Sequence, residues 1–128
     1  MISQTGVILG AFLYLHLKHF LCDFPLQSGY QLRTKGIYGD FGGILHASIH
    51  ALATVPVFLL FRPAMVTALA IVASEFVLHY HIDWLKERIL KNRSWDSTTY
   101  GFWQILGADQ MLHNFTYVGI IAALIFAG

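Results

Sequence analysis

The sequence predicts an all-α integral membrane protein in which four helices form an up-down-up-down bundle. Two observations predict this class. Apolar residues make up 56% of the chain and mean hydropathy is +0.59, while charged residues fall to 12%, against about a quarter in ordinary soluble domains. The chain also contains four apolar runs, each near the roughly 20 residues that a spanning helix needs. With 128 residues, it is expected to form one domain, residues 1–128.

The expected helices are separated by polar or turn-forming segments. The first ends before Pro25, and the glycine-rich stretch 26–43 is expected to be a loop. Arg62 and Pro63 make a connection so short that the second and third helices must form an antiparallel hairpin. The third helix ends in charged turns that protrude into water, before a polar loop at 92–99. The helices are expected at about 6–24, 44–61, 64–91 and 100–126.

Basic residues are distributed unevenly over the connections. The first and third connections carry several Lys and Arg, whereas the second carries Arg62 alone. By the positive-inside rule, the first and third connections are cytoplasmic and both termini lie on the non-cytoplasmic side. Net charge is only +1 and no basic stripe is present, so nucleic acid is not an expected partner. Cys22 is the only cysteine, which excludes an intrachain disulfide and a cysteine-only zinc site.

Eight His and Asp side chains fall into pairs at i,i+4 spacing, with one pair in each expected helix. This spacing places two side chains on the same helical face. Among the seven His and five Asp of the chain, about one such pair is expected by chance. Alternating helix directions bring all four pairs to the same depth, so the eight side chains are expected to meet. The pairs are His19/Asp23, His46/His50, His79/Asp83 and Asp109/His113.

These eight side chains predict a metal site. Ionisable groups inside membrane segments are costly, usually face the bundle interior and are functional candidates. Three clustered carboxylates would repel one another, and divalent cations relieve that repulsion. Five imidazoles and three carboxylates can supply two ions, and this mixed set of nitrogen and oxygen ligands suits Zn, Mn, Fe or Co. A dinuclear site near the cytoplasmic face, with Zn as the first candidate, is therefore expected.

Three neighbouring side chains are candidate catalytic residues. Glu75 lies one turn before His79 and is a candidate ligand, general base or salt-bridge partner. Lys86, one turn after Asp83, can pair with that carboxylate, extend towards the interface or receive a phosphate group, and Gln110 can hydrogen-bond a ligand or substrate. His81 lies only two residues from His79, on another face of the helix. It is expected to tolerate substitution.

The ordered polar motifs resemble a known family. They are His19-Phe-Leu-Cys-Asp23-Phe-Pro-Leu-Gln27, His46-Ala-Ser-Ile-His50, His79-Tyr-His-Ile-Asp83-Trp-Leu-Lys86 and Asp109-Gln110-Met-Leu-His113. Together they resemble the small bacterial and phage membrane family catalogued as domain of unknown function 3307. The resemblance implies a four-helix, multi-pass protein of the bacterial inner membrane, with Gln27, Lys86 and Gln110 beside the eight candidates. More distantly, the pattern is similar to inner-membrane metal-dependent hydrolases. Cys22 directly precedes Asp23, at a position where the domain-of-unknown-function family is expected to have glycine.

The function expected from these features is metal-dependent hydrolysis. A metal-activated hydroxide would attack an ester or phosphoester of a lipid or membrane-proximal substrate. The expected partners are the lipid bilayer and a small-molecule or lipid substrate, and a homo-oligomer is compatible with the sequence. Three alternatives remain open: a non-haem diiron oxidoreductase of the desaturase or hydroxylase kind, a metal or proton transporter, and a structural membrane protein with a His/Asp hydrogen-bond network. The apolar far halves of the second and fourth helices argue against transport.

Overall fold

A computed structural model describes residues 3–126, and these residues form helices joined by short connections. No strand occurs within that range, so the predicted all-α class is confirmed. The elements are α1 (Gln4–Asp23), α2 (Gly29–Thr34), α3 (Phe41–Leu52), the 3-10 helix η1 (Val55–Val57), α4 (Phe58–Phe61), α5 (Met65–Arg93) and α6 (Tyr100–Phe126).

Three helical segments are long and apolar enough to cross a membrane. They are Gln4–Asp23, Phe41–Phe61 and Met65–Arg93, which agrees with the prediction of a membrane protein. The fourth expected span, α6, has 27 residues and is long enough. Its polar residues, among them Asp109, His113 and Asn114, lower its hydropathy, and α6 is not among the three.

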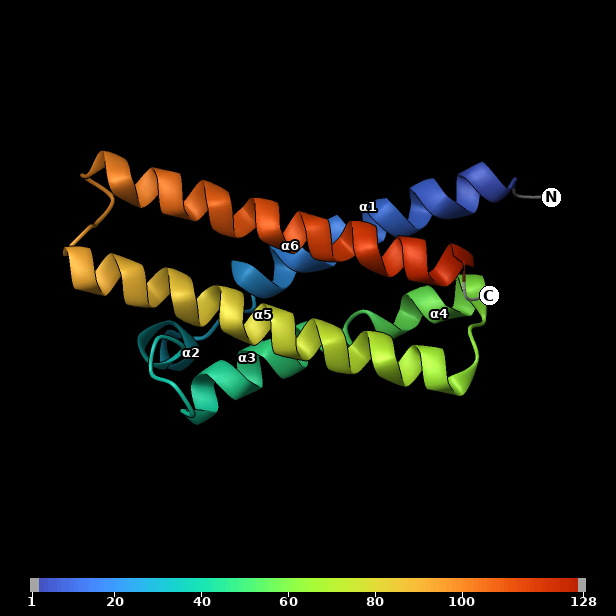
Figure 1. Cartoon of the computed structure of the whole chain (residues 1–128), viewed down its shortest axis with the longest axis horizontal. Helices are drawn as coiled ribbons and strands as arrows, with labels where there is room; N and C mark the ends of the chain where they lie inside the picture. The colour runs from blue at the N-terminus through green and yellow to red at the C-terminus, as the bar shows by residue number, and fades with distance from the viewer. Residues whose placement is uncertain (1–2, 127–128) are drawn as a thin grey trace.

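The long helices run in alternate directions along one axis (Figure 1). Helix α5 packs against α3 on one side and α6 on the other, while α1 also packs against both α3 and α6. The first and last helices therefore meet, and the two ends of the described chain lie at the same end of the molecule (Figure 1). The opposite end holds the α5–α6 connection and α2, and the predicted His/Asp pairs lie between the two ends.

The connection 26–43 is not the simple loop that was expected, because α2 forms within it. Ser28 caps α2 by accepting from the Gln31 backbone N–H, and the Gln31 side chain accepts from the Ser28 N–H. This reciprocal pair is a capping box, which satisfies donors that the first turn leaves free. Asp40 caps α3 by accepting from the Gly42 N–H, which holds the pKa of Asp40 below its usual value. Helix α3 consequently starts at Phe41, earlier than predicted.

The second predicted helix, 44–61, is interrupted after Leu52. The chain passes through a turn at Ala53 and Thr54 before η1 and α4 continue in the same general direction. Pro56 lies in the first turn of η1, and its missing N–H and fixed ring are incompatible with an unbroken helix here. Arg62 then adopts a left-handed conformation that ends α4.

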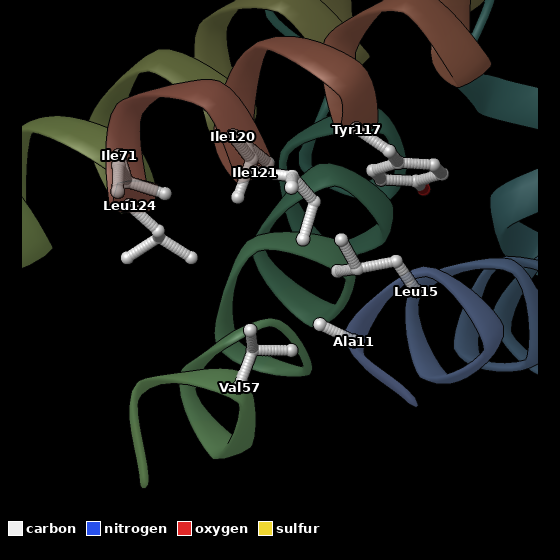
Figure 2. Packing of buried hydrophobic residues seen from close by; sticks show 8 residues of the cluster. All are labelled: Ala11, Leu15, Val57, Ile71, Tyr117, Ile120, Ile121 and Leu124. Atoms are coloured by element: carbon white, nitrogen blue, oxygen red, sulfur yellow. The ribbon is translucent and has the colours of Figure 1, made fainter. Parts of the chain in front are cut away.

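An apolar core fills the end of the molecule near the termini. Figure 2 shows side chains from α1, η1, α5 and α6 packed together, with Leu15, Tyr117 and Ile121 close to one another. Its buried members are Ala11, Leu15, Val57, Ile71, Tyr117, Ile120, Ile121 and Leu124. The Tyr117 hydroxyl lies 2.8 Å from the buried His19 Nδ1, so the apolar core borders the buried polar residues at Tyr117.

Gly36 lets the turn after α2 approach α5 closely. A Cβ at this position would lie 2.8 Å from the Glu87 Cβ. We expect Gly36→Ala to lower the free energy of unfolding by about 1–3 kcal/mol, because one of the two backbones must shift. The measurement is denaturation of the purified protein in detergent. Gly10→Ala is the control, since the structure places nothing among the described residues within 4 Å of that Cβ; an equal loss there would contradict the packing argument.

Candidate metal centre

The eight predicted side chains are buried and come together between the helices. Helix α1 supplies His19 and Asp23, α3 supplies His46 and His50, α5 supplies His79 and Asp83, and α6 supplies Asp109 and His113. They form three overlapping groups in which the candidate ligand atoms lie within 4.8 Å of one another. The groups are Asp23–His46–His50–His79, His19–His79–His113 and Asp83–Asp109–His113.

The largest group is centred on Asp23 and three imidazoles. The Asp23 Oδ1 atom lies 3.1 Å from His46 Nε2 and 3.0 Å from His50 Nε2. The rings of His50 and His79 stack with centroids 3.7 Å apart. Despite these short distances, neither Asp23 Oδ1 nor His50 Nε2 makes a hydrogen bond of acceptable geometry within residues 3–126. The atoms therefore converge on a shared space, as ligands of one ion do.

The third group, with Asp83, Asp109 and His113, shows the same arrangement less compactly. His113 Nε2 lies 3.5 Å from Asp83 Oδ1 and 3.6 Å from Asp109 Oδ1. His79 and His113 belong to two groups each, and their ring centroids are 4.2 Å apart. The groups are thus parts of one continuous cluster rather than separate sites.

Unpartnered polar atoms are concentrated in this cluster. Leaving a buried donor or acceptor without a partner costs about 1–3 kcal/mol each. A divalent cation satisfies such atoms because carboxylate oxygens and neutral imidazole nitrogens are metal ligands. The cluster atoms without a hydrogen-bond partner in the described part of the chain are Asp23 Oδ1, His50 Nδ1 and Nε2, His79 Nε2, Asp109 Oδ1 and His113 Nε2. This donor set fits a transition-metal ion.

Both ring nitrogens of His19 have hydrogen-bond partners. Nδ1 lies 2.8 Å from the Tyr117 hydroxyl, and Nε2 lies 3.1 Å from both Gln110 Oε1 and Asp23 Oδ2. Gln110 Nε2 also donates to Asp109 Oδ2 at 3.0 Å, so this amide links two candidate ligands. An ion at His19 must therefore displace one of these hydrogen bonds.

The structure adds Lys35 to the cluster and shows the position of Lys86. Lys35 Nζ donates to Asp83 Oδ2 at 3.2 Å, and Lys86 Nζ lies 3.3 Å from Asp83 Oδ1 and 3.4 Å from Asp109 Oδ2. Both lysines are buried. These ammonium groups offset part of the negative charge of the three carboxylates, and Lys86 pairs with Asp83. Lys35 is one of the basic residues of the first connection, and its place beside Asp83 was not predicted.

Glu75 is paired with Lys18 and is not part of the three groups found in residues 3–126. Both side chains are almost fully buried, and Lys18 Nζ also donates to the His50 carbonyl at 2.8 Å. Of the three roles considered for Glu75, this geometry matches the salt-bridge partner. Sequence reasoning missed Lys18, although a lysine inside an apolar span is a signal for a buried partner.

His81 lies outside the cluster, as expected from its spacing. Its side chain is exposed, with Nδ1 2.7 Å from the Val77 carbonyl and Nε2 3.2 Å from the Tyr38 hydroxyl. Gln27 lies beside His46; with its amide oriented to satisfy both ends, it donates to the Asp23 carbonyl and accepts from Lys35 Nζ at 3.0 Å. Gln27 therefore supports the cluster from the α1–α2 connection.

Fold and site together define a helical membrane protein with a buried His/Asp cluster. Residues 11–127 match the family described as protein of unknown function (DUF3307), and the chain belongs to that family. No curated protein and no solved structure matches the chain. The family membership confirms the resemblance seen in the motifs, whereas the more distant likeness to metal-dependent hydrolases finds no support in these comparisons.

Proposed function

We propose that this chain is a membrane-embedded metal-dependent hydrolase that cleaves an ester or phosphoester of a lipid or membrane-proximal substrate. The observation that carries the proposal is the cluster of buried, unpartnered ligand atoms from His50, His79, His113, Asp23 and Asp109. If the cluster only joined the helices through hydrogen bonds, these nitrogen and oxygen atoms would be expected to bond to one another. Their lack of such bonds among the described residues favours an ion as their common partner.

The best-formed ion position is the group Asp23–His46–His50–His79. Three imidazoles and one carboxylate, all buried, form a mixed nitrogen and oxygen set of the kind that Zn takes. A second ion belongs at Asp83, Asp109 and His113, where it must compete with the Lys86 ammonium group. The two positions are therefore expected to differ in affinity, with Zn first and Mn, Fe or Co as other candidates.

A bound divalent metal supplies an activated water, since it lowers the pKa of that water to about 7. The residues of the chain bind the substrate and orient the metal ligands. Lys35 and Lys86 hold an anionic group of the substrate near Asp23, and Gln110 orients His19 and Asp109 through its amide. Glu75 stabilises the helices through Lys18 rather than touching the substrate.

The proposed membrane arrangement has four spanning helices in a bundle within the bacterial inner membrane. Both termini lie on the non-cytoplasmic side, and the cluster lies towards the cytoplasmic face. The basic residues of the first and third connections support this orientation. The apolar core near the termini supports hydrolysis over transport, because a conduction path needs polar groups across the whole bilayer.

The test of the proposal is hydrolysis of short-chain esters and phosphoesters by protein purified in detergent. We expect turnover with metal-loaded protein, and a loss of about 100-fold or more after chelation or in His50→Ala. The control His81→Ala should keep full turnover. Equal activity in chelated and metal-loaded protein would refute metal dependence. If metal-loaded protein cleaved none of the esters or phosphoesters, the proposed hydrolase activity would be refuted.

Lys86→Met should strengthen the second ion position. Removing one positive charge that lies within 3.4 Å of two candidate ligands relieves repulsion of an incoming dication. We expect the weaker metal dissociation constant to fall by about tenfold or more, measured by titration with a competing chelator. Lys91→Met, an exposed lysine of the same helix, is the control. An unchanged second constant would show that Lys86 does not occupy an ion position.

A further inference from the structure

A cavity of about 360 Å³ lies beside the cluster, between the end of α1, α2 and the facing parts of α5 and α6. The polar residues that line it are Asp23, Gln27, Lys35, Lys86, Glu87 and Gln110. We call this cavity the lysine pocket. Asp23 belongs both to its wall and to the best-formed ligand group, so an ion held there would border the pocket.

The rest of the lining is apolar. Phe24 and Leu32 are exposed, and Leu90 and Phe102 contribute further apolar surface. A cavity lined by two buried lysines and by exposed aromatic and aliphatic side chains matches an amphiphile with an anionic headgroup. A neutral lipid-soluble compound has no anionic group for the two ammonium groups to bind, so it fits this pocket less well.

The charge of the pocket and the adjoining cluster depends on the ion. The lining itself holds two carboxylates, Asp23 and Glu87, and two ammonium groups, Lys35 and Lys86. Asp83 and Asp109 pair with these lysines from the cluster side, so with neutral imidazoles the pocket and cluster together carry a formal charge of −2 before any ion binds. An anion is repelled from that pocket. One dication neutralises the excess, and a second reverses the sign. An anion should therefore bind only after metal has bound.

We propose that the lysine pocket binds a phosphate group, and that it does so only when the neighbouring ligand group holds metal. This inference rests on the proposed function and names the substrate class of the same site. Lys35 and Lys86 both line the pocket, and an ammonium group has three N–H donors. Lys35 Nζ donates to Asp83 and to the reoriented Gln27 amide, and Lys86 Nζ donates to Asp83 and Asp109, so each lysine keeps one donor for a phosphate oxygen. The phosphate can come from a lipid headgroup or from a free phosphate compound.

The experiment is calorimetric titration of detergent-purified protein with inorganic phosphate, with dihexanoyl phosphatidic acid and with neutral dihexanoylglycerol. Each probe is titrated into zinc-loaded protein freed of excess zinc and into chelated protein. We expect phosphate to bind the zinc-loaded form about tenfold or more tightly than the chelated form. By reciprocity, phosphate should raise the zinc affinity by the same factor. Phosphatidic acid binding tighter than inorganic phosphate identifies a lipid headgroup; equal affinities identify a free phosphate compound.

Lys35→Met provides the matched variant. It should retain zinc, since Lys35 is in none of the ligand groups found in the described chain, and lose about tenfold or more in phosphate affinity. Lys91→Met should change neither. Zinc-loaded protein that binds phosphate no better than chelated protein, or that prefers dihexanoylglycerol, would overturn this inference and leave the metal proposal standing. Protein that takes up no zinc would overturn both.

Discussion

Replacing Glu75 with alanine is expected to lower the free energy of unfolding by about 3–5 kcal/mol, because Lys18 is then left buried and unpaired. Glu75 is 1% exposed and Lys18 4%, so water cannot replace the missing carboxylate without a local opening of the helices. Lys18 also donates to the His50 carbonyl, and its displacement should disturb the metal-binding face of α3. Reversible unfolding in mixed micelles measures the loss.

The double variant Lys18→Met, Glu75→Met separates the pair from the rest of the packing. Replacing both members of a buried ion pair with apolar residues is often neutral or stabilising. We therefore expect the double variant to recover most of the stability that Glu75→Ala loses. Ser74→Ala, at the exposed neighbouring position, should change little. Additive losses in the single and double variants would contradict the view that Lys18 and Glu75 act as a pair.

Replacing His79 with alanine is expected to weaken metal binding by about 100-fold or more. His79 belongs to two of the three ligand groups, is 1% exposed, and has an Nε2 atom without a hydrogen-bond partner among residues 3–126. Loss of even an outer-shell partner commonly costs 10–100-fold in metal affinity, so loss of a direct ligand should cost at least as much. Competition with a chromophoric chelator measures the affinity.

His81→Ala is the matched control for that experiment. It removes the same side chain from the same helix, two residues away, where the imidazole is exposed and contacts Val77 and Tyr38. Its metal affinity should equal that of the unmodified protein. If both variants bound metal as tightly as the parent, the cluster would be a hydrogen-bond network and not a metal site.

The sequence alone predicted most of what positions the site. The i,i+4 spacing of pairs such as His46/His50 follows from helix geometry, and alternating helix directions bring the pairs together. Hydropathy identified three of the four predicted spans, including the hairpin closed at Arg62 and Pro63. These features depend on local periodicity and segment length, which can be determined from a single sequence.

Other features depend on contacts between distant segments. Lys35 lies in a connection that looks solvent-exposed, yet α2 folds it back onto Asp83, 48 residues further along the chain. The pairing of Lys18 with Glu75 likewise joins α1 to α5. Tyr117 had a visible signal, since it lies one turn after His113, but its contact with His19 requires α1 and α6 to be neighbours. Composition gives no guide to such pairings.

The break in the second predicted helix has a different cause. Hydropathy is insensitive to a missing backbone donor, so the run through Pro56 reads as continuous although α3 ends at Leu52. The break does not disturb the site, because His46 and His50 both precede it. The consequence is confined to the apolar end, where η1 places Val57 in the core.

X-ray absorption at the metal edge of the unmodified protein, purified in detergent without added metal, tests the proposed metal centre most directly. We expect a stoichiometric transition metal with nitrogen and oxygen ligands at about 2.0–2.2 Å and multiple scattering from imidazole rings. Asp23, His46, His50 and His79 supply that shell. Protein without bound metal, or a shell dominated by the sulfur of Cys22, would contradict the proposed site.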